Sequence, residues 1–288
     1  MLEHRGPDLQ VVLQRLGLDF HVVHHAARGD ARLSAILMHG FSAHVGLYSH
    51  VAAALADQGI AVTQFDGRGH GKSGGRRGHV DDFGDYLDDL AMVIEWARRR
   101  NPTLPWALVG HSLGGAIGLS YVLDPKRVDK PTRLVLAAPW LKLKMAVPAP
   151  KRLAANVVAK VYPTLSMANG LLAADISRNP EVLAGFDRDP LVHHVASAGW
   201  FMTTLRAQAH IRTHAAELKV PTLILLAGED RIVANEASET FARDAGNIVE
   251  VRRYPGLFHE LYLEPEAEAV VTDIRSWLLS DGTKANAA

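Results

Sequence analysis

Residues 106–123 read WALVGHSLGGAIGLSYVL, and this stretch decides the fold. Its apolar start, Trp106–Val109, predicts a buried strand, while the largely apolar run Leu113–Leu123 predicts a buried helix. The motif G-H-S-L-G at 110–114 joins the two and has the pattern G-x-S-x-G. In a sharp strand-to-helix turn, such glycines let the neighbouring backbone approach, and the serine hydroxyl stands at the carboxyl edge of the sheet. The stretch therefore predicts that Ser112 is a nucleophile carried on this turn.

Short apolar runs alternate with helical patterns on both sides of this stretch. The predicted strands are Leu33–Met38, Ile60–Phe65, Trp106–Val109, Arg133–Ala138, Thr222–Ala227 and Ile248–Tyr254. The predicted helices are Leu47–Gln58, Phe83–Arg100, Leu113–Leu123 and Glu266–Leu279. Strands that alternate with helices imply crossover connections, so we expect an α/β fold with a mostly parallel central sheet flanked by helices.

The alternation stops between residues 140 and 196, where no clear strand is predicted. This segment begins with Pro-containing text, LKLKMAVPAPKRL at 141–153, and continues as Ala-rich helical sequence. It is too long for a simple loop. We therefore expect residues 140–196 to form a helical cap, or lid, inserted into a core made of residues 1–139 and 197–288.

A serine hydroxyl is a weak nucleophile and needs a base with an orienting carboxylate. In this arrangement the three residues follow one another in the order Ser, Asp, His. Asp230 comes directly after the predicted strand Thr222–Ala227, and His259 follows the last predicted strand. We expect His259 to act as general base and Asp230 to orient it. Glu229 lies at the same strand end and is the rival acid.

Position along the chain separates His259 from the other histidines of a chain that contains 15 in total. The other candidate histidines all come before Asp230: His21, His24, His25, His193 and His194. Adjacent histidines point to different sides of a chain, and no H-E-x-x-H helix occurs, so we predict no metal site.

Stabilisation of an oxyanion needs two backbone N–H donors. Leu113 follows the nucleophile directly, and its amide is one expected donor. The other is the amide of Phe41, in the sequence H-G-F-S at 39–42 that follows the first predicted strand. Gly40 allows a close approach at that point.

The sequence DGRGHGKS at 66–73 ends like a phosphate-binding loop, but the motif G-x-x-x-x-G-K-S requires glycine where this chain has Asp66. We interpret it as a structural turn rather than a nucleotide site. The acidic residues Asp81, Asp82, Asp85, Asp88 and Asp89 do not match a calcium loop, and we expect them to begin and solvate the next helix.

Composition excludes several classes of function. The 288 residues include 31 Lys plus Arg and 31 Asp plus Glu, so no net charge attracts nucleic acid. Cysteine is absent, which removes disulfides, thiolate metal sites and cysteine nucleophiles. The N-terminal sequence lacks the pattern of a secretory signal, so we expect a cytoplasmic protein.

Seven blocks of sequence resemble the α/β-hydrolase fold family and, within it, the monoacylglycerol lipase and lysophospholipase group. They are MHGFSAH at 38–44, FDGRGHGKSGG at 65–75, RGHVDDFGDYLDDL at 77–90, GHSLGGAIGL at 110–119, SRNPEVLAGFDRDPLVHH at 177–194, VPTLILLAGEDRIV at 220–233 and YPGLFHELYLEP at 254–265. The resemblance implies a cap after the sixth strand of the fold. It places Ser112, Asp230 and His259 on the family's triad, and Phe41 and Leu113 on its oxyanion donors.

The resemblance implies a serine hydrolase that releases fatty acid from monoacylglycerols and needs no cofactor. A lysophospholipase, a general carboxylesterase, a thioesterase or a peptidase of the same fold remains an alternative, because the triad does not choose the acyl partner. A non-catalytic binding protein on this scaffold is the alternative from another class. No oligomeric state is assigned from the sequence.

The cap sequence supports a small acyl-ester or lipid substrate. Its apolar residues are Val147, Leu153, Val157, Val158, Val161, Leu165, Met167, Leu171 and Leu172, and its basic residues are Lys142, Lys144, Lys151, Arg152 and Lys160. Apolar side chains beside basic ones suit transient contact with a membrane surface. The alternative is that the apolar residues only pack the cap onto the core.

Overall fold

The structure is a computed structural model. It describes residues 6–144 and 149–280, and within them the side chains of all except 149–152 and 154. The predicted cap residue Val147 lies outside the described residues, as do the side chains of Lys151 and Arg152.

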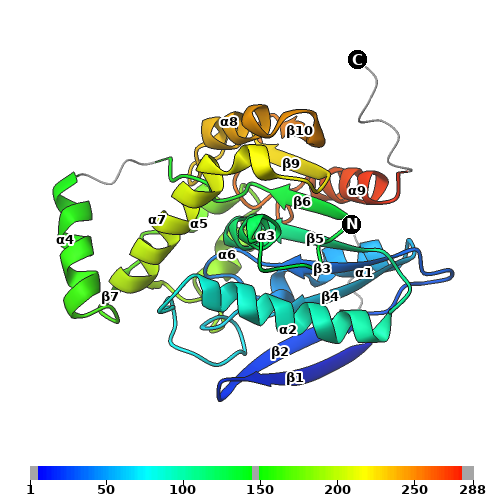
Figure 1. Ribbon diagram of the computed structural model, residues 1–288, viewed down its shortest axis with the longest axis horizontal. Helices are drawn as coiled ribbons and strands as arrows, with labels where there is room; N and C mark the ends of the chain where they lie inside the picture. The colour runs from blue at the N-terminus through cyan, green and yellow to red at the C-terminus, as the bar shows by residue number, and fades with distance from the viewer. Residues whose placement is uncertain (1–5, 145–148, 281–288) are drawn as a thin grey trace.

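Eight strands form one sheet in the order β1-β2-β4-β3-β5-β6-β9-β10. Their bounds are β1 (Leu9–Arg15), β2 (Leu18–His25), β3 (Leu33–Met38), β4 (Ile60–Phe65), β5 (Trp106–His111), β6 (Arg133–Ala137), β9 (Thr222–Ala227) and β10 (Val249–Tyr254). β1 pairs antiparallel with β2, and β2 pairs antiparallel with β4. The other neighbours are parallel, which confirms the predicted mostly parallel α/β sheet (Figure 1).

All six predicted strands are present, with ends that differ by at most two residues. The hairpin β1–β2 was not predicted. Its β1 strand alternates between half-buried and exposed residues, as expected for the outermost strand of a sheet.

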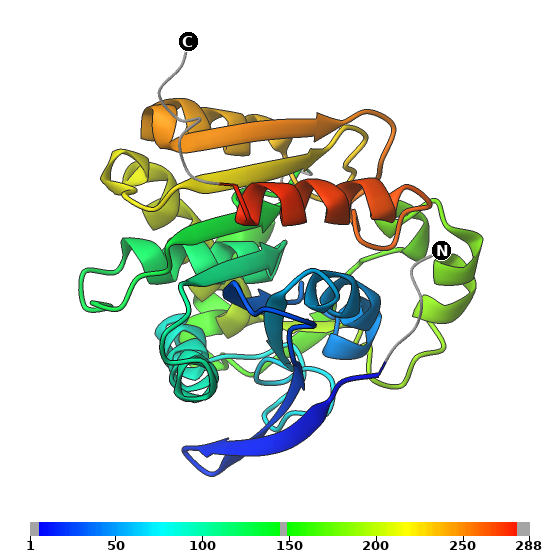
Figure 2. The same cartoon turned by 90° about the vertical axis from the view of Figure 1, so that its right-hand side faces the viewer.

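Helices cover both faces of the sheet. One face carries α1 (Ser49–Ala56) and α9 (Ala267–Leu278), which appear together in Figure 2. The other carries α2 (Gly84–Arg100), α3 (Leu113–Leu123), α7 (Ala198–Thr213) and α8 (Asn235–Ala245). Successive residues of a strand face opposite sides, so Ile36 packs in one core layer and Leu37 in the other.

Single-turn helices complete the chain around these elements. They are η1 (Val45–Tyr48), η2 (Ala215–Glu217) and η3 (Gly246–Ile248). In residues 6–144 and 149–280, no helix combines the length and the apolarity needed to span a bilayer.

The segment after β6 departs from the parallel pattern. It contains α4 (Ala149–Val161), β7 (Ser166–Ala168), α5 (Ala173–Ile176), α6 (Pro180–Phe186) and β8 (Val195–Ser197). The expectation of no strand here is wrong, because β7 and β8 pair antiparallel, with Met167 opposite Ala196. Strands of three residues are too short to leave a periodic pattern, and their partners lie far apart in the sequence.

The acidic run around the start of α2 divides into two parts. Asp81 and Asp82 are exposed, and Asp85 lies in the first turn, where the helix dipole favours negative charge. The expectation that the acidic run is solvated is wrong for Asp89, because Asp89 is 0% exposed. Asp88 is half-buried and also makes ion pairs.

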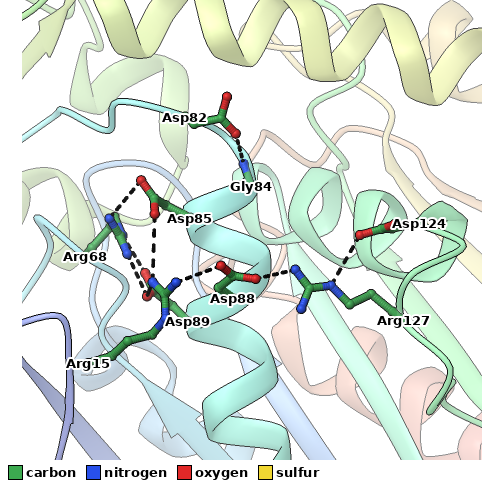
Figure 3. A network of polar contacts seen from close by, with 9 residues as sticks. All are labelled: Arg15, Arg68, Asp82, Gly84, Asp85, Asp88, Asp89, Asp124 and Arg127. Carbon is green, nitrogen blue, oxygen red and sulfur yellow. Dashed lines mark hydrogen bonds and ion pairs between the residues drawn. The ribbon is translucent and has the colours of Figure 1, made fainter.

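Three arginines from distant segments neutralise the inner carboxylates (Figure 3). Arg15, at the end of β1, lies 3.0 Å from Asp89. Arg68, in the loop after β4, makes two hydrogen bonds to Asp89 of 2.5 and 2.8 Å. Arg127, from the loop after α3, pairs with Asp88. The ion pairs therefore fasten the N-terminal hairpin and the loop after β4 to α2.

Candidate active site

Ser112 lies at the turn between β5 and α3, in a backbone conformation that residues other than glycine rarely adopt. Its φ is 50° and its ψ is −111°. A Cβ at Gly110 would lie 2.5 Å from the carbonyl oxygen of Gly114, and one at Gly114 would lie 2.7 Å from the carbonyl oxygen of His39. Both motif glycines are therefore required sterically, and the chain turns sharply enough to set the hydroxyl at the edge of the sheet.

The three predicted triad residues meet at the carboxyl edge of the sheet. Nε2 of His259 lies 3.0 Å from Oγ of Ser112, and Nδ1 of His259 lies 2.8 Å from Oδ2 of Asp230. All three residues are buried. The rival acid Glu229 is exposed, and the carboxylate against the imidazole is that of Asp230.

Backbone amides hold the Asp230 carboxylate in place. Its Oδ1 accepts hydrogen bonds of 2.8 Å from the amides of Ile232 and Val233, which leaves Oδ2 for the imidazole. Burial by itself raises the pKa of Asp230, but His259 and these two amides together bring the pKa below its usual value. The carboxylate therefore stays ionised beside the histidine.

The imidazole of His259 responds to the same contact. Burial by itself lowers the pKa of His259, but the charge of Asp230 and its hydrogen bond raise the pKa above the usual 6.5. The contact suits a base that must accept a proton from Ser112, because the carboxylate stabilises the imidazolium.

The loop after β3 approaches Ser112 closely because it contains Gly40. A Cβ on Gly40 would lie 2.9 Å from Nδ1 of His111 and 3.2 Å from Cβ of Ser112. His39 holds the peptide that follows, since its Nδ1 lies 2.7 Å from the carbonyl oxygen of Gly40. The C=O and N–H of a trans peptide point in opposite directions, so the amide of Phe41 faces away from His39.

His39 is a residue of the site that the sequence did not identify. Its Nε2 accepts a hydrogen bond of 2.9 Å from the amide of Gly67, so its Nδ1 is left as the donor to Gly40. Burial lowers the pKa of His39, and the neutral ring suits this pair of contacts. The sequence feature that could have identified His39 is its position one residue before Gly40.

The other predicted oxyanion donor, Leu113, is the first residue of α3. Its amide lies at a helix N-terminus, where N–H groups lack intrahelical partners.

The side chain of Phe41 stacks on Trp200 of α7, with ring centroids 3.8 Å apart and planes at 21°. Stacking of this kind fixes the side chain that follows Gly40.

A cavity of about 680 Å³ opens onto Ser112 and His259. Its lining is mostly apolar and comes from loops at the edge of the sheet, from α7 and from the segment after β6; it includes Phe41, Trp140, Val158, Leu165, Leu171, Phe186, Trp200 and Ile232. The described lining residues include no Lys or Arg. Such a cavity suits an apolar ligand with few polar groups.

Side-chain contacts join the loop after β3 to the segment after β6. Nδ2 of Asn169 donates to Oγ of Ser42 at 2.9 Å, and Nε2 of His44 lies 2.8 Å from Asp189. The contact of Asn169 lies beside the cavity, because Asn169 is one of its lining residues.

The loop at 66–73 is a turn built around a carboxylate, as interpreted from the sequence. Asp66 accepts hydrogen bonds of 2.8 Å from the amides of Val45 and Lys72. A Cβ on Gly71 would lie 2.3 Å from the carboxyl carbon of Asp66, so only glycine fits there. The loop thus wraps its own aspartate.

Comparison with known proteins agrees with this architecture. The family profile described as serine aminopeptidase S33 matches residues 29–266. A monoacylglycerol lipase of Mycolicibacterium smegmatis is 34% identical over 253 residues, which cover 87% of this chain and 89% of that protein. The phospholipase YtpA of Bacillus subtilis is 30% identical over 245 residues, which cover 84% and 93%.

A solved structure extends the comparison to three dimensions. The crystal structure of the Paleococcus ferrophilus monoacylglycerol lipase superimposes with a TM-score of 0.81 at 28% identity, over 90% of this chain and 98% of that one. The profile match covers most of the chain, and the sheet order and helix placement agree with an α/β-hydrolase fold. This chain therefore belongs to the serine aminopeptidase S33 family of α/β-hydrolases.

Proposed function

We propose that this protein is a serine ester hydrolase that releases fatty acid from monoacylglycerols through an acyl-enzyme. One observation carries the proposal: Ser112, His259 and Asp230 form a continuous hydrogen-bonded chain at the wall of a large apolar cavity. Relatives named monoacylglycerol lipase, including one at 34% identity, support the choice of substrate.

The reaction begins with the hydroxyl of Ser112. Its oxygen attacks the ester carbonyl while His259 Nε2 takes its proton, and Asp230 stabilises the imidazolium that results. The amides of Phe41 and Leu113 donate to the oxyanion of the tetrahedral intermediate. The imidazolium then protonates the leaving glycerol oxygen, and the acyl group remains on the serine.

Deacylation repeats the same steps with water. His259 takes a proton from the water, whose oxygen attacks the acyl carbonyl, and the second tetrahedral intermediate uses the same two amides. Collapse returns the proton to Oγ of Ser112 and releases the fatty acid. This sequence requires no metal and no cofactor.

The cavity favours a neutral head group over a charged one. A lysophospholipid would bring a phosphate, and the described lining includes no Lys or Arg to pair with it. Lysophospholipid hydrolysis is the second candidate, because a relative at 30% identity is named a phospholipase. General carboxylesterase or thioesterase activity uses the same catalytic residues with a different acyl partner.

We assign residues 140–196 to a cap, and residues 1–139 and 197–288 to the hydrolase core. The assignment is supported by the break in strand–helix alternation after β6 and by the cap side chains that complete the cavity wall: Ala155, Val158, Leu165, Met167, Leu171 and Phe186. The acyl chain would lie between the cap and the core.

The outer surface of the cap suits transient contact with a membrane. Val157 and Val161 lie one turn apart on α4 and are 56% and 81% exposed, and Leu172 is 62% exposed. Exposed lysines of the same segment include Lys160. An apolar patch with cationic neighbours favours an anionic lipid surface.

Vesicle binding tests this contact. The double variant Val157→Ser/Val161→Ser should bind phosphatidylcholine–phosphatidylglycerol vesicles more weakly than the parent protein in a flotation assay. Val128→Ser is the control, because Val128 is 91% exposed but lies in the loop between α3 and β6. Equal binding by all three proteins would contradict the proposed contact.

The central experiment measures fatty-acid release from 1-monoacylglycerols of graded chain length, with lysophosphatidylcholine in parallel and Ser112→Ala as control. We expect chain-length-dependent release from the monoacylglycerols that disappears in the variant. Faster release from lysophosphatidylcholine would favour the second candidate. Turnover confined to short activated esters would favour a general esterase.

Labelling with a fluorophosphonate separates an enzyme from a binding protein on the same scaffold. A serine with a working base reacts with the probe, and an inert scaffold does not. We expect stoichiometric labelling that Ser112→Ala abolishes.

A further inference from the structure

Three buried polar side chains lie directly behind the triad. Tyr48 ends η1, His111 ends β5, and Glu260 follows His259 in the chain. The hydroxyl of Tyr48 lies 2.9 and 2.8 Å from the two carboxylate oxygens of Glu260. It also lies 3.1 Å from Nδ1 of His111. The mechanism described above uses none of these three groups.

The three side chains reach the main chain of His259 through His111. Nε2 of His111 lies 3.0 Å from the carbonyl oxygen of His259, and the ring centroids of the two histidines are 4.9 Å apart. His111 is also the residue before Ser112, and Glu260 is the residue after His259. The trio of Tyr48, His111 and Glu260 therefore joins the strand that carries the nucleophile to the loop that carries the base.

The contacts of the trio require a hydrogen between each pair of neighbouring polar atoms. A carbonyl only accepts, so Nε2 of His111 donates to His259 and a neutral ring keeps a lone pair at Nδ1. Tyr48 has one hydroxyl hydrogen, which serves Glu260 or Nδ1 of His111, but not both. With an ionised carboxylate and a neutral ring, one of the two contacts of Tyr48 would set lone pair against lone pair.

One further proton places a hydrogen between each pair of neighbouring groups in the trio. A protonated Glu260 donates to the oxygen of Tyr48, whose hydrogen then goes to Nδ1 of His111. Alternatively the imidazolium of His111 donates to Tyr48, which donates to the Glu260 carboxylate. In both forms the trio carries no net charge, and this suits three side chains that are buried.

The groups around the trio come from several elements. His259 and Asp230 face His111, Tyr262 packs on Tyr48 with ring centroids 5.3 Å apart, and His39 lies within the electrostatic reach of Glu260. Burial raises the pKa of Tyr48 well above its usual value, so the phenol stays protonated. Burial lowers the pKa of His111.

We propose that Tyr48, Glu260 and His111 share one buried proton and act as positioning residues that hold the main chain of His259 against the strand carrying Ser112. The inference rests on the proposed function, because it assigns supporting partners to the proposed base. Loss of the shared proton would leave a net negative charge beside His259 and remove a hydrogen from the chain of bonds that orients His111.

Two substitutions test the proposal in opposite directions. Tyr48→Phe removes the central hydroxyl, and we expect kcat to fall roughly tenfold or more while KM stays unchanged, because a small displacement of a reacting group is costly. Glu260→Gln keeps the shape and supplies a permanent N–H donor to Tyr48, so it mimics the protonated carboxyl. We expect this variant to keep its kcat, and to keep it at alkaline pH, where the parent protein loses the shared proton and activity.

Tyr262→Phe is the matched control. The hydroxyl of Tyr262 is buried in the same ring cluster but has no hydrogen-bond partner in the described residues, so its removal breaks no bond of the trio. Thermal unfolding of each variant and its rate of fluorophosphonate labelling separate a displaced base from a destabilised fold. Slower labelling of Tyr48→Phe at an unchanged Tm supports a positioning role.

The outcomes distinguish this inference from the proposed function. Ester hydrolysis that survives in Ser112→Ala overturns the proposed function itself. If Ser112→Ala is inactive but Tyr48→Phe matches Tyr262→Phe in kcat and pH profile, only the positioning role is overturned. If the pH profile of Glu260→Gln superimposes on that of the parent protein, the shared proton is overturned.

Discussion

The Nδ1 atom of His259 lies 2.8 Å from Oδ2 of Asp230, and both side chains are buried. This contact raises the pKa of His259 above 6.5 despite burial, because the aspartate charge stabilises the imidazolium. The proposed base must be neutral to accept a proton, so kcat should rise with pH as His259 loses its proton at that raised pKa.

Asp230→Asn should lower kcat by roughly a thousandfold or more, because an amide no longer orients the imidazole or stabilises its charged form. It should also move the acidic limb of the pH–kcat profile to lower pH, since the contribution that raises the pKa of His259 is lost. Steady-state kinetics over a pH series checks both effects. Glu229→Gln is the control and should leave the profile unchanged, because Glu229 is exposed.

Ser112→Gly should abolish hydrolysis but stabilise the fold. The backbone of Ser112 has φ 50° and ψ −111°, which glycine adopts without strain. Relief of that strain, less the extra entropy of glycine in the unfolded chain, should raise the free energy of unfolding by about 1 kcal/mol. Chemical denaturation checks this against Ser112→Ala, which keeps a Cβ and should match the parent protein. A destabilised glycine variant would contradict the strain at the turn.

Asp89→Asn should destabilise the protein by about 2 kcal/mol, because it removes a charged hydrogen-bond acceptor, while Arg15 and Arg68 keep their ion pairs with Asp85 and Asp88. Arg15 and Arg68 both pair with this carboxylate (Figure 3). Asp82→Asn is the matched control, since Asp82 is exposed and its side chain accepts a hydrogen bond from the amide of Gly84. Urea unfolding of the two variants should differ clearly, and equal values would exclude a structural role for the Asp89 ion pairs.

Glu264 should make stability depend on acid pH. Its side chain is 0% exposed and accepts hydrogen bonds from Ser177, from the amide and guanidinium of Arg178, and from the amide of Phe258. Burial by itself raises the pKa of Glu264, but these donors bring the pKa below the usual 4.5. The stabilisation is therefore present above the unfolded-state pKa and is lost as the pH falls through the folded-state value.

Glu264→Gln should accordingly be less stable than the parent protein at neutral pH, and the difference should shrink as the pH falls. Denaturant unfolding at a series of pH values measures it. Glu266→Gln is the control, because Glu266 pairs with the same Arg178 but is 49% exposed, so its loss should change stability little. A stability difference for Glu264→Gln that does not vary with pH would contradict the linkage.

The sequence predicted the elements of the core because their signals are local. Apolar runs and helical periodicity defined the parallel strands and the covering helices, and the G-x-S-x-G motif between two such elements predicted the turn at Ser112. The order of residues along the chain singled out His259 and favoured Asp230 as the acid, with Glu229 at the same strand end as its rival. Their catalytic roles stay predictions that the experiments above test.

Other features had no local signal. The pair β7–β8 joins Met167 to Ala196 across a long stretch of sequence, and three residues carry too little pattern to predict a strand. Asp89 appeared as one member of an acidic run, and its burial depends on Arg15 and Arg68, which come from distant segments.

By itself, then, the sequence determined the fold class, the turn that carries Ser112 and the choice of His259 as its expected partner, because each follows from periodicity, motif spacing and chain order. The tertiary structure alone decided that Asp230 rather than Glu229 contacts the imidazole, that His39 fixes the peptide before Phe41, and that Tyr48 reaches Glu260. The physical reason is that hydrogen bonds between buried side chains depend on distances set by packing of the whole sheet, which no local pattern encodes.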